Sequence, residues 1–125
     1  MIAAWDSQLI AAIAASDDLH IAPFRANGNT TGTPTWIWSV VVEDRLFVRA
    51  YNGPASRWFQ SAMTQHAGQV TAAGRTIDVS FTPADPALQD RIDATYRAKY
   101  AGDFYLGSMI GERAHAATVE ITPRE

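Results

Sequence analysis

Two runs of strand-forming residues, separated by only two polar residues, constrain the fold of this chain more than any other feature. Residues 33–42 and 45–51 are rich in Val, Ile, Thr, Trp and Phe, which favour β-strands. Glu43 and Asp44 leave room only for a tight turn between the two runs. The sequence therefore predicts an antiparallel β-hairpin in this part of the chain.

Period-two alternation assigns the side chains of this hairpin to two faces, because successive side chains of a strand point to opposite sides. On the first strand, one face carries Trp36, Trp38, Val40 and Val42; on the second strand, one face carries Phe47, Arg49 and Tyr51, and the other carries Leu46, Val48 and Ala50. Arg49 thus places a charge in the middle of a strand. Such a charge is costly unless it is paired or contacts a ligand.

The remaining segments show further helix and strand patterns. We predict helices over residues 5–15 and 55–67 and from Asp85 onward, strands over 19–25, 69–73, 75–82 and 114–122, and a flexible loop over 102–111. Gly68 is placed to end the second helix, and Asp85 to cap the third. On the third helix, Asp93 can pair with Arg97 one turn further on.

Six strands, mostly joined as hairpins, and about three helices predict a mainly β (α+β) fold. A small closed barrel suits these strands because it leaves no free sheet edge. A length of 125 residues leaves room for one domain, so residues 1–125 are predicted to form a single barrel domain. Charged residues make up only 18% of the chain, which leaves apolar surface for a partner or a ligand.

Charge and composition argue against several classes of protein. The net charge of −3 argues against nucleic-acid binding through a broad basic field. The chain has no cysteine, and its 3 histidines show no ligand spacing, so we predict no metal site. No stretch approaches the roughly 20 apolar residues of a membrane span, and the first residues lack the basic flank of a signal peptide. We therefore expect a cytoplasmic protein without a membrane partner.

The basic residues of this chain are almost all arginines, with Lys99 as the one lysine. The planar guanidinium group can grip phosphate or carboxylate at two points. A GC-rich genome would produce the same bias without any functional meaning. Nucleotide-binding glycine motifs, nucleophile elbows and zinc-protease motifs are absent from the sequence, so no residue is predicted to be catalytic.

Ser56 and Arg57 stand out among the polar residues because they open a predicted helix after a Gly-Pro turn. The free N–H groups and the dipole at a helix start favour an anion. Together with Arg49 they would form a phosphate cradle. The alternative is that Ser56 caps the helix and that the arginine pairs with Glu43 or Asp44. The residues alone leave both interpretations open.

Three short stretches resemble the core of the split-barrel flavin-binding superfamily, which includes pyridoxamine phosphate oxidases and deazaflavin-dependent nitroreductases. They are residues 32–38, 45–51 and 56–58. Nearly the whole chain is also similar to a family of small bacterial proteins catalogued as a domain of unknown function. The stretches that carry this second resemblance are 20–25, 32–38, 51–53 with 56–58, and 96–102 with 111–119.

The superfamily resemblance implies a six-stranded split β-barrel, usually a homodimer with flavin in a groove between the subunits. In the oxidases, a basic residue on a central strand and a Ser-Arg-Lys string hold the phosphate. Ser56 and Arg57 match the start of that string, but Trp58 stands where the lysine would be. One phosphate ligand is therefore lost. Arg49 could replace it, or Trp58 could stack on a ring.

The resulting hypothesis is an oxidoreductase-type protein that binds FMN or a deazaflavin, with no substrate predicted. Arg49, Ser56 and Arg57 would hold the phosphate, while Thr35, Trp36, Tyr51 and Trp58 would line the ring site. The alternatives are a non-catalytic small-molecule-binding module and a structural dimer, each on a split barrel that has lost its flavin. A homodimer is expected because the low charge content and the Trp-rich strand leave apolar surface exposed.

Overall fold

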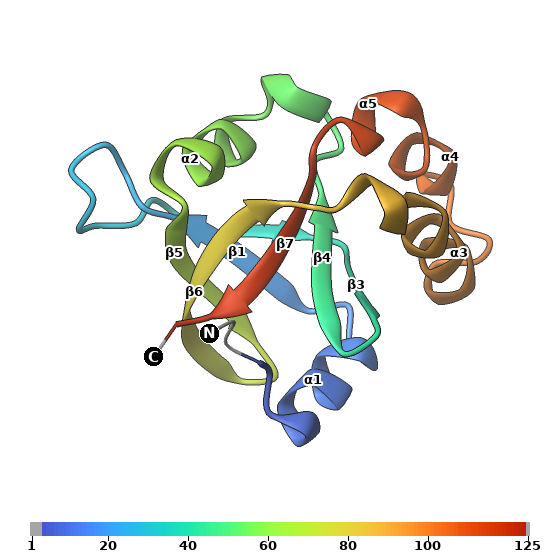
Figure 1. The fold of residues 1–125 in the computed structure, drawn as a ribbon, viewed down its shortest axis with the longest axis horizontal. Helices are drawn as coiled ribbons and strands as arrows, with labels where there is room; N and C mark the ends of the chain where they lie inside the picture. The colour runs from blue at the N-terminus through green and yellow to red at the C-terminus, as the bar shows by residue number, and fades with distance from the viewer. Residues whose placement is uncertain (1–3, 125) are drawn as a thin grey trace.

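In residues 4–124, which the computed structural model describes, seven antiparallel strands form one sheet that curls into a nearly closed barrel (Figure 1). The strands are β1 (Leu19–Pro23), β2 (Thr35–Ile37), β3 (Ser39–Val42), β4 (Arg45–Arg49), β5 (Ala67–Ala72), β6 (Arg75–Pro83) and β7 (Thr118–Pro123). Their order in the sheet is β2-β1-β5-β6-β7-β4-β3. The prediction of a mainly β, barrel-like fold is confirmed at this level.

The single strand predicted over residues 33–42 is divided at Trp38, which is why the sheet has seven strands rather than the expected six. β2 pairs with β1 at one end of the sheet order, and β3 pairs with β4 at the other. Because β2 and β3 are joined through Trp38, the two ends of the sheet meet and the barrel nearly closes. Alternation in the sequence carries no signal for the point at which a strand changes its partner.

The hairpin predicted from the first two runs is confirmed as β3 and β4. Glu43 and Asp44 both adopt left-handed backbone angles, with φ of 53° and 60°. Two such residues make the turn type whose twist matches that of the flanking strands. Ala73 and Gly74, with φ of 51° and 73°, form the corresponding turn between β5 and β6.

Five α-helices lie around the barrel within the same residues (Figure 1). They are α1 (Ser7–Ala14), α2 (Arg57–Gln65), α3 (Gln89–Lys99), α4 (Leu106–Met109) and α5 (Glu112–His115), with 3-10 turns η1 (Gly53–Ala55) and η2 (Pro86–Leu88). The prediction of about three helices is wrong because α4 and α5 are too short to show a helical period. None of the described helices has the length and apolar character needed to span a membrane.

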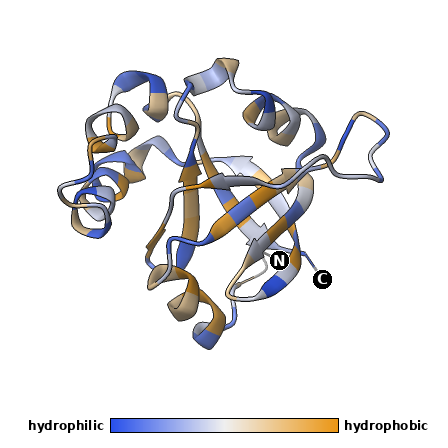
Figure 2. Cartoon of the chain, turned by 180° about the vertical axis from the view of Figure 1, so that it is seen from behind, coloured by the Kyte–Doolittle hydropathy of each residue, from blue (hydrophilic) through white to orange (hydrophobic). Residues whose placement is uncertain are grey.

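The sheet packs an apolar core against each of its two faces. The barrel core includes Ile21, Leu46, Val48, Val70, Phe81 and Ile121, with α1 contributing Ile10 and Ile13. The second core places Trp38, Val40, Val42 and Phe47 of the hairpin against Ile92 and Tyr96 of α3. In Figure 2, hydrophobic and hydrophilic residues accordingly alternate along the strands. On the first strand the predicted face is confirmed for Trp38, Val40 and Val42, whereas Trp36, before the break, is 50% exposed. On the second strand, Tyr51 lies beyond the end of β4 and is 42% exposed.

Lys99 and Tyr100, at the end of α3, hold the main chain at the strand break. The Lys99 ammonium group donates to the carbonyls of Ser16 and Ser39 at 2.6 and 2.7 Å. The Tyr100 hydroxyl accepts from the Ser39 N–H at 3.1 Å, and its ring stacks on Trp38 with centroids 4.0 Å apart. Burial lowers the pKa of Lys99. At the strand break, main-chain groups thus find hydrogen-bond partners in α3 rather than in the sheet.

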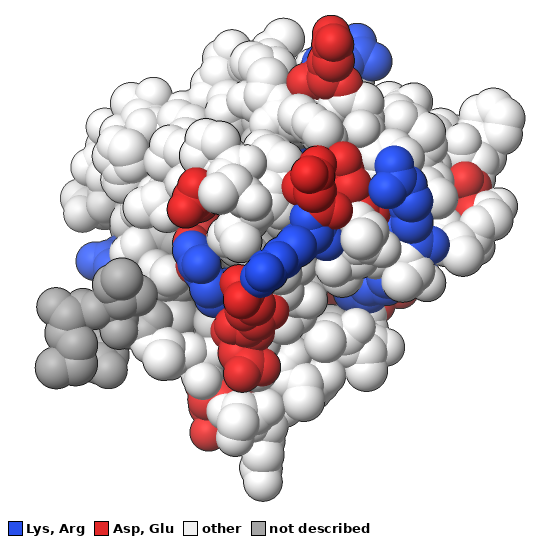
Figure 3. All heavy atoms as spheres, turned by 45° about the vertical axis from the view of Figure 1, so that its right-hand side comes forward, with Lys and Arg blue, Asp and Glu red and all other residues white. Residues whose placement is uncertain are grey.

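Two ion pairs lie at the surface beside the β3–β4 hairpin. Arg45 donates to Glu120 through Nε at 2.9 Å and Nη2 at 2.6 Å, and this hydrogen bonding raises the pKa of Arg45. Arg91 pairs with Glu43 at 2.6 Å. On the face drawn in Figure 3, acidic and basic side chains lie next to one another.

Gly68 does not end α2, contrary to the prediction. His66 does so with a left-handed φ of 59°, and Gly68 lies within β5, opposite Pro23 of β1. A Cβ atom on Gly68 would lie 2.5 Å from the carbonyl oxygen of Ala22 and 2.6 Å from the Cα of Pro23. Glycine is therefore required here by the close approach of two strands.

We expect Gly68→Ala to lower the free energy of unfolding by about 1–3 kcal/mol, as overpacking does, because main-chain atoms cannot rotate away from the new methyl group. Gly107→Ala is the matched control, since nothing lies within 4 Å of its Cβ position. Alanine in α4 should be neutral or slightly stabilising. Urea denaturation of both variants measures the difference, and equal losses would contradict the close approach.

Candidate functional site

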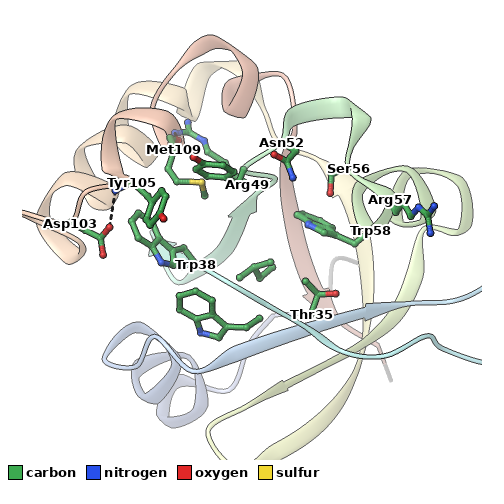
Figure 4. A pocket seen from close by; sticks show the side chains of 13 residues that line it. Thr35, Trp38, Arg49, Asn52, Ser56, Arg57, Trp58, Asp103, Tyr105 and Met109 are labelled. Atoms are coloured by element: carbon green, nitrogen blue, oxygen red, sulfur yellow. Dashed lines mark hydrogen bonds between the residues drawn. The ribbon is translucent and has the colours of Figure 1, made fainter.

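A pocket of about 630 Å³ opens at the strand break, between β2, the end of β4, the start of α2 and residues 103–109 (Figure 4). Its lining contains all seven residues predicted to contact a cofactor, although they come from three separate stretches of sequence. They are Thr35, Trp36, Arg49, Tyr51, Ser56, Arg57 and Trp58. The fold thus brings the whole predicted set to one place.

Six further residues line the pocket and were not predicted as site residues: Ile37, Trp38, Asn52, Asp103, Tyr105 and Met109. The first three are neighbours of predicted residues in the sequence, so proximity alone could have found them. The last three belong to the stretch predicted to be a flexible loop, which contains α4. Only the tertiary fold brings this stretch to the barrel.

Aromatic rings form much of the pocket wall. Figure 4 shows the rings of Trp58 and Tyr105 projecting into it from α2 and from the stretch before α4. The indole N–H of Trp36 donates to the carbonyl of Asp17 at 2.7 Å, which fixes that half-exposed ring. Tyr51 meets Tyr105 edge to face, with centroids 5.6 Å apart. A flat, apolar ligand would find several ring faces and edges here.

Arg49 lies beneath this wall, with its side chain fully buried. Its Nε donates to Thr118 Oγ1 at 3.0 Å, and its Nη1 donates to Asp93 at 2.6 Å and to the Met109 carbonyl at 3.0 Å. Its Nη2 donates to the side-chain oxygen of Gln89. Every nitrogen of the guanidinium group therefore has a partner within the chain.

Asp93, not Glu43 or Asp44, is the acidic partner of Arg49, and Asp93 does not pair with Arg97 as predicted. The reason is the orientation of α3, which turns Asp93 towards the barrel and buries it. The ring Nε2 of His115 lies 2.8 and 3.0 Å from the two oxygens of this carboxylate. The network joins β4, α3, α5 and β7 under the pocket.

The start of α2 forms one rim of the pocket. Ser56 occupies the N-cap position, but its side chain makes no capping hydrogen bond. Arg57 is exposed and forms no ion pair within residues 4–124. Figure 4 shows its side chain extending outward from the rim. The first N–H groups of α2, which have no partner inside the helix, therefore lie beside an exposed cation.

Asp103 lies at the opposite side of the pocket from Arg57 (Figure 4). One of its carboxylate oxygens accepts from the Tyr105 N–H at 2.9 Å, and the side chain is exposed. It forms no ion pair in the described part of the chain. The pocket therefore carries a positive group at one end and a negative group at the other.

Two phenols of the second core cannot act as bases near neutral pH. Burial raises the pKa of Tyr96, although the nearby Arg49 opposes this, and it raises the pKa of Tyr100 to about 12. Both hydroxyls therefore stay protonated. Tyr100 therefore serves packing and hydrogen bonding to Ser39, and Tyr96 serves packing alone, since its buried hydroxyl has no hydrogen-bond partner within residues 4–124.

We expect Arg49→Met to cost about 3–5 kcal/mol of unfolding free energy, because it leaves the Asp93 carboxylate buried without its cation. The double variant Arg49→Met/Asp93→Leu should recover most of that loss, since no charge stays buried. Arg91→Met is the control: its pair with Glu43 is 60% and 53% exposed and should cost at most about 1 kcal/mol. Similar losses for both single variants in chemical denaturation would contradict a structural role for the buried pair.

The comparisons with known proteins place the chain in a family but assign no activity. Residues 9–121, which include every residue of the pocket, match the family model described as an uncharacterized protein conserved in bacteria (DUF2255). No curated protein matches the chain. The predicted resemblance to a small bacterial family of unknown function is thus confirmed, whereas the link to flavin-binding proteins stays a prediction. The chain belongs to this family of proteins conserved in bacteria.

Proposed function

We propose that the pocket binds FMN or a deazaflavin and that the protein is of the oxidoreductase type. The observation that carries this proposal is the convergence of all seven predicted cofactor residues on one pocket. The volume of about 630 Å³ lies within the range of pockets that hold one cofactor-sized ligand. The position at the break of the barrel also fits the split-barrel architecture that the sequence resembles.

The phosphate end of the ligand fits best at Ser56 and Arg57. The Ser56 hydroxyl makes no capping bond, and the N–H groups at the start of α2 favour an anion. Arg57 must turn inward to reach the ligand, which costs little because exposed side chains change rotamer within nanoseconds. The role predicted for Arg49 as a phosphate ligand is less favoured, since its nitrogens already donate to Asp93 and other acceptors.

The ring of the ligand fits between the aromatic walls. Trp36, Tyr51 and Trp58 offer ring faces and edges, and Thr35 adds a hydroxyl at the side of β2. These side chains would exclude water from the bound ring and fix its orientation. When bound, the cofactor supplies the redox chemistry, and the protein supplies position and electrostatics.

A second candidate function is a non-catalytic binding module that uses the same pocket for another aromatic anion. Two observations favour it. Arg49 is neutralised by Asp93, and Trp58 replaces the lysine of the oxidases, so fewer cations face a phosphate than in those enzymes. The two proposals differ in one measurable property: the first requires that the pocket bind FMN or a deazaflavin, and the second does not.

We expect Arg57→Ala to weaken binding of FMN or of a deazaflavin mononucleotide by about ten- to a hundredfold, as loss of a charge-assisted contact does. Arg57→Lys should recover only part, because a point charge cannot reproduce the guanidinium fork. Arg97→Ala, on the exposed side of α3 and outside the pocket, is the matched control.

Fluorescence titration measures these affinities, and thermal melts of each variant check that folding is unchanged. The cofactor proposal is wrong if the wild type binds neither compound. It is also weakened if Arg57→Ala and Arg97→Ala bind FMN equally well.

We also propose that the protein is a homodimer. Phe104 is 91% exposed and lies next to the pocket residue Tyr105, with which it packs edge to face at 5.3 Å. This ring adds to the apolar surface that the low charge content of the chain leaves for a second copy to cover.

Light scattering at micromolar concentration should give twice the chain mass of 13.6 kDa. Phe104→Asp should shift the mass towards the monomer without changing the melting temperature of the monomer, because the side chain is exposed. A monomer mass for the wild type would refute the dimer.

A further inference from the structure

The two ends of the pocket differ in charge, and this difference points to the chemistry of a second ligand group. Arg57 lies at one end and Asp103 at the other (Figure 4). Arg49, the other cation in the lining, is neutralised by Asp93. The Asp103 end therefore carries a local negative charge that nothing in the described chain pairs within ion-pair distance.

Two tyrosine rings of the lining, one of them two residues after Asp103, make a corner. The planes of Tyr51 and Tyr105 meet at 80°, with centroids 5.6 Å apart, and both residues line the pocket. Tyr51 is 42% and Tyr105 52% exposed, so parts of both rings remain open to a ligand. Aromatic faces attract cations, and perpendicular rings in a pocket that also carries a carboxylate supply the elements from which a site for an ammonium group is built.

The anchoring of Asp103 gives this corner a fixed shape. One carboxylate oxygen accepts from the Tyr105 N–H at 2.9 Å, so Asp103 and Tyr105 are held in one turn. The Arg49 guanidinium holds the Met109 carbonyl at 3.0 Å, which secures the other end of the same stretch. The second oxygen of Asp103 remains available to a ligand.

We propose that Asp103, Tyr51 and Tyr105 form a subsite for an organic cation, namely the ammonium group of an amine-bearing substrate. The inference deepens the proposed function, on which it rests for the assignment of the Arg57 end to the cofactor. The pocket then takes an anionic cofactor group at α2 and a cationic substrate group before α4.

Three probes with the same phenyl group test the subsite: phenethylamine, which is cationic, phenethyl alcohol, which is neutral, and phenylacetate, which is anionic. Their affinities can be measured at low ionic strength by protein-observed NMR. We expect the amine to bind about five- to tenfold more tightly than the alcohol, from one exposed charge pair and one cation–π contact. Phenylacetate should bind at the Arg57 end.

Two variants locate the amine. Asp103→Asn keeps the acceptor for the Tyr105 N–H and should weaken amine binding by about two- to fivefold, with no effect on the alcohol. Tyr105→Leu should weaken amine binding by a similar factor. Asp44→Asn, an exposed carboxylate at the far end of the β3–β4 hairpin, is the matched control and should change nothing. Arg57→Ala should weaken only phenylacetate.

Equal affinities for amine and alcohol, an unchanged amine affinity in Asp103→Asn, or no binding of any probe would overturn the subsite. A separate FMN titration distinguishes its failure from that of the proposed function. Amine preference without FMN binding would refute the cofactor and retain the cation subsite. FMN binding without amine preference would refute the subsite alone.

Discussion

The buried ion pair between Arg49 and Asp93 is the interaction on which the rest of the structure depends. A guanidinium group removed from water must find acceptors for all of its nitrogens, and here they come from α3, β7 and the stretch before α5. If some of these acceptors were missing, the Arg49 guanidinium group would be buried with part of its charge unpaired. Helices α3, α4 and α5 must therefore dock on the barrel together, and the segment that ends in α4 then forms one side of the pocket.

The fold could be predicted from the sequence where the pattern is local. The prediction failed where the structure depends on contacts between residues that are far apart in the sequence. The hairpin around Glu43 and Asp44 follows from alternation and a two-residue gap. The break at Trp38 does not, because it is held by a ring and a hydroxyl of Tyr100, 61 positions beyond Ser39. Nothing in residues 33–42 encodes that contact, so one strand was predicted where two are present.

The candidate site also contains residues that the sequence indicates and residues that only the tertiary fold brings to the pocket. Ser56 and Arg57 open a helix after a Gly-Pro turn, so local chemistry sufficed to bring them forward, whereas Trp36 and Tyr51 became candidates through the resemblance to the split-barrel superfamily. For Arg49, the sequence correctly required a partner or a ligand, but it suggested neighbouring acids rather than Asp93, 44 positions away. Asp103 carries no local signal at all, since an acid in a loop is ordinarily solvated.

The hydrogen bond from Arg49 to Met109 ends on a backbone carbonyl, and this has an evolutionary consequence. A main-chain acceptor is supplied by any amino acid, so this hydrogen bond does not depend on the side chain at position 109, which packs separately in the second core. Relatives can thus diversify the side chains between Tyr100 and Gly111 while the segment keeps its place at the mouth of the barrel. If relatives bind different ligands, the differences can accumulate in this segment by point mutation without any change in the barrel.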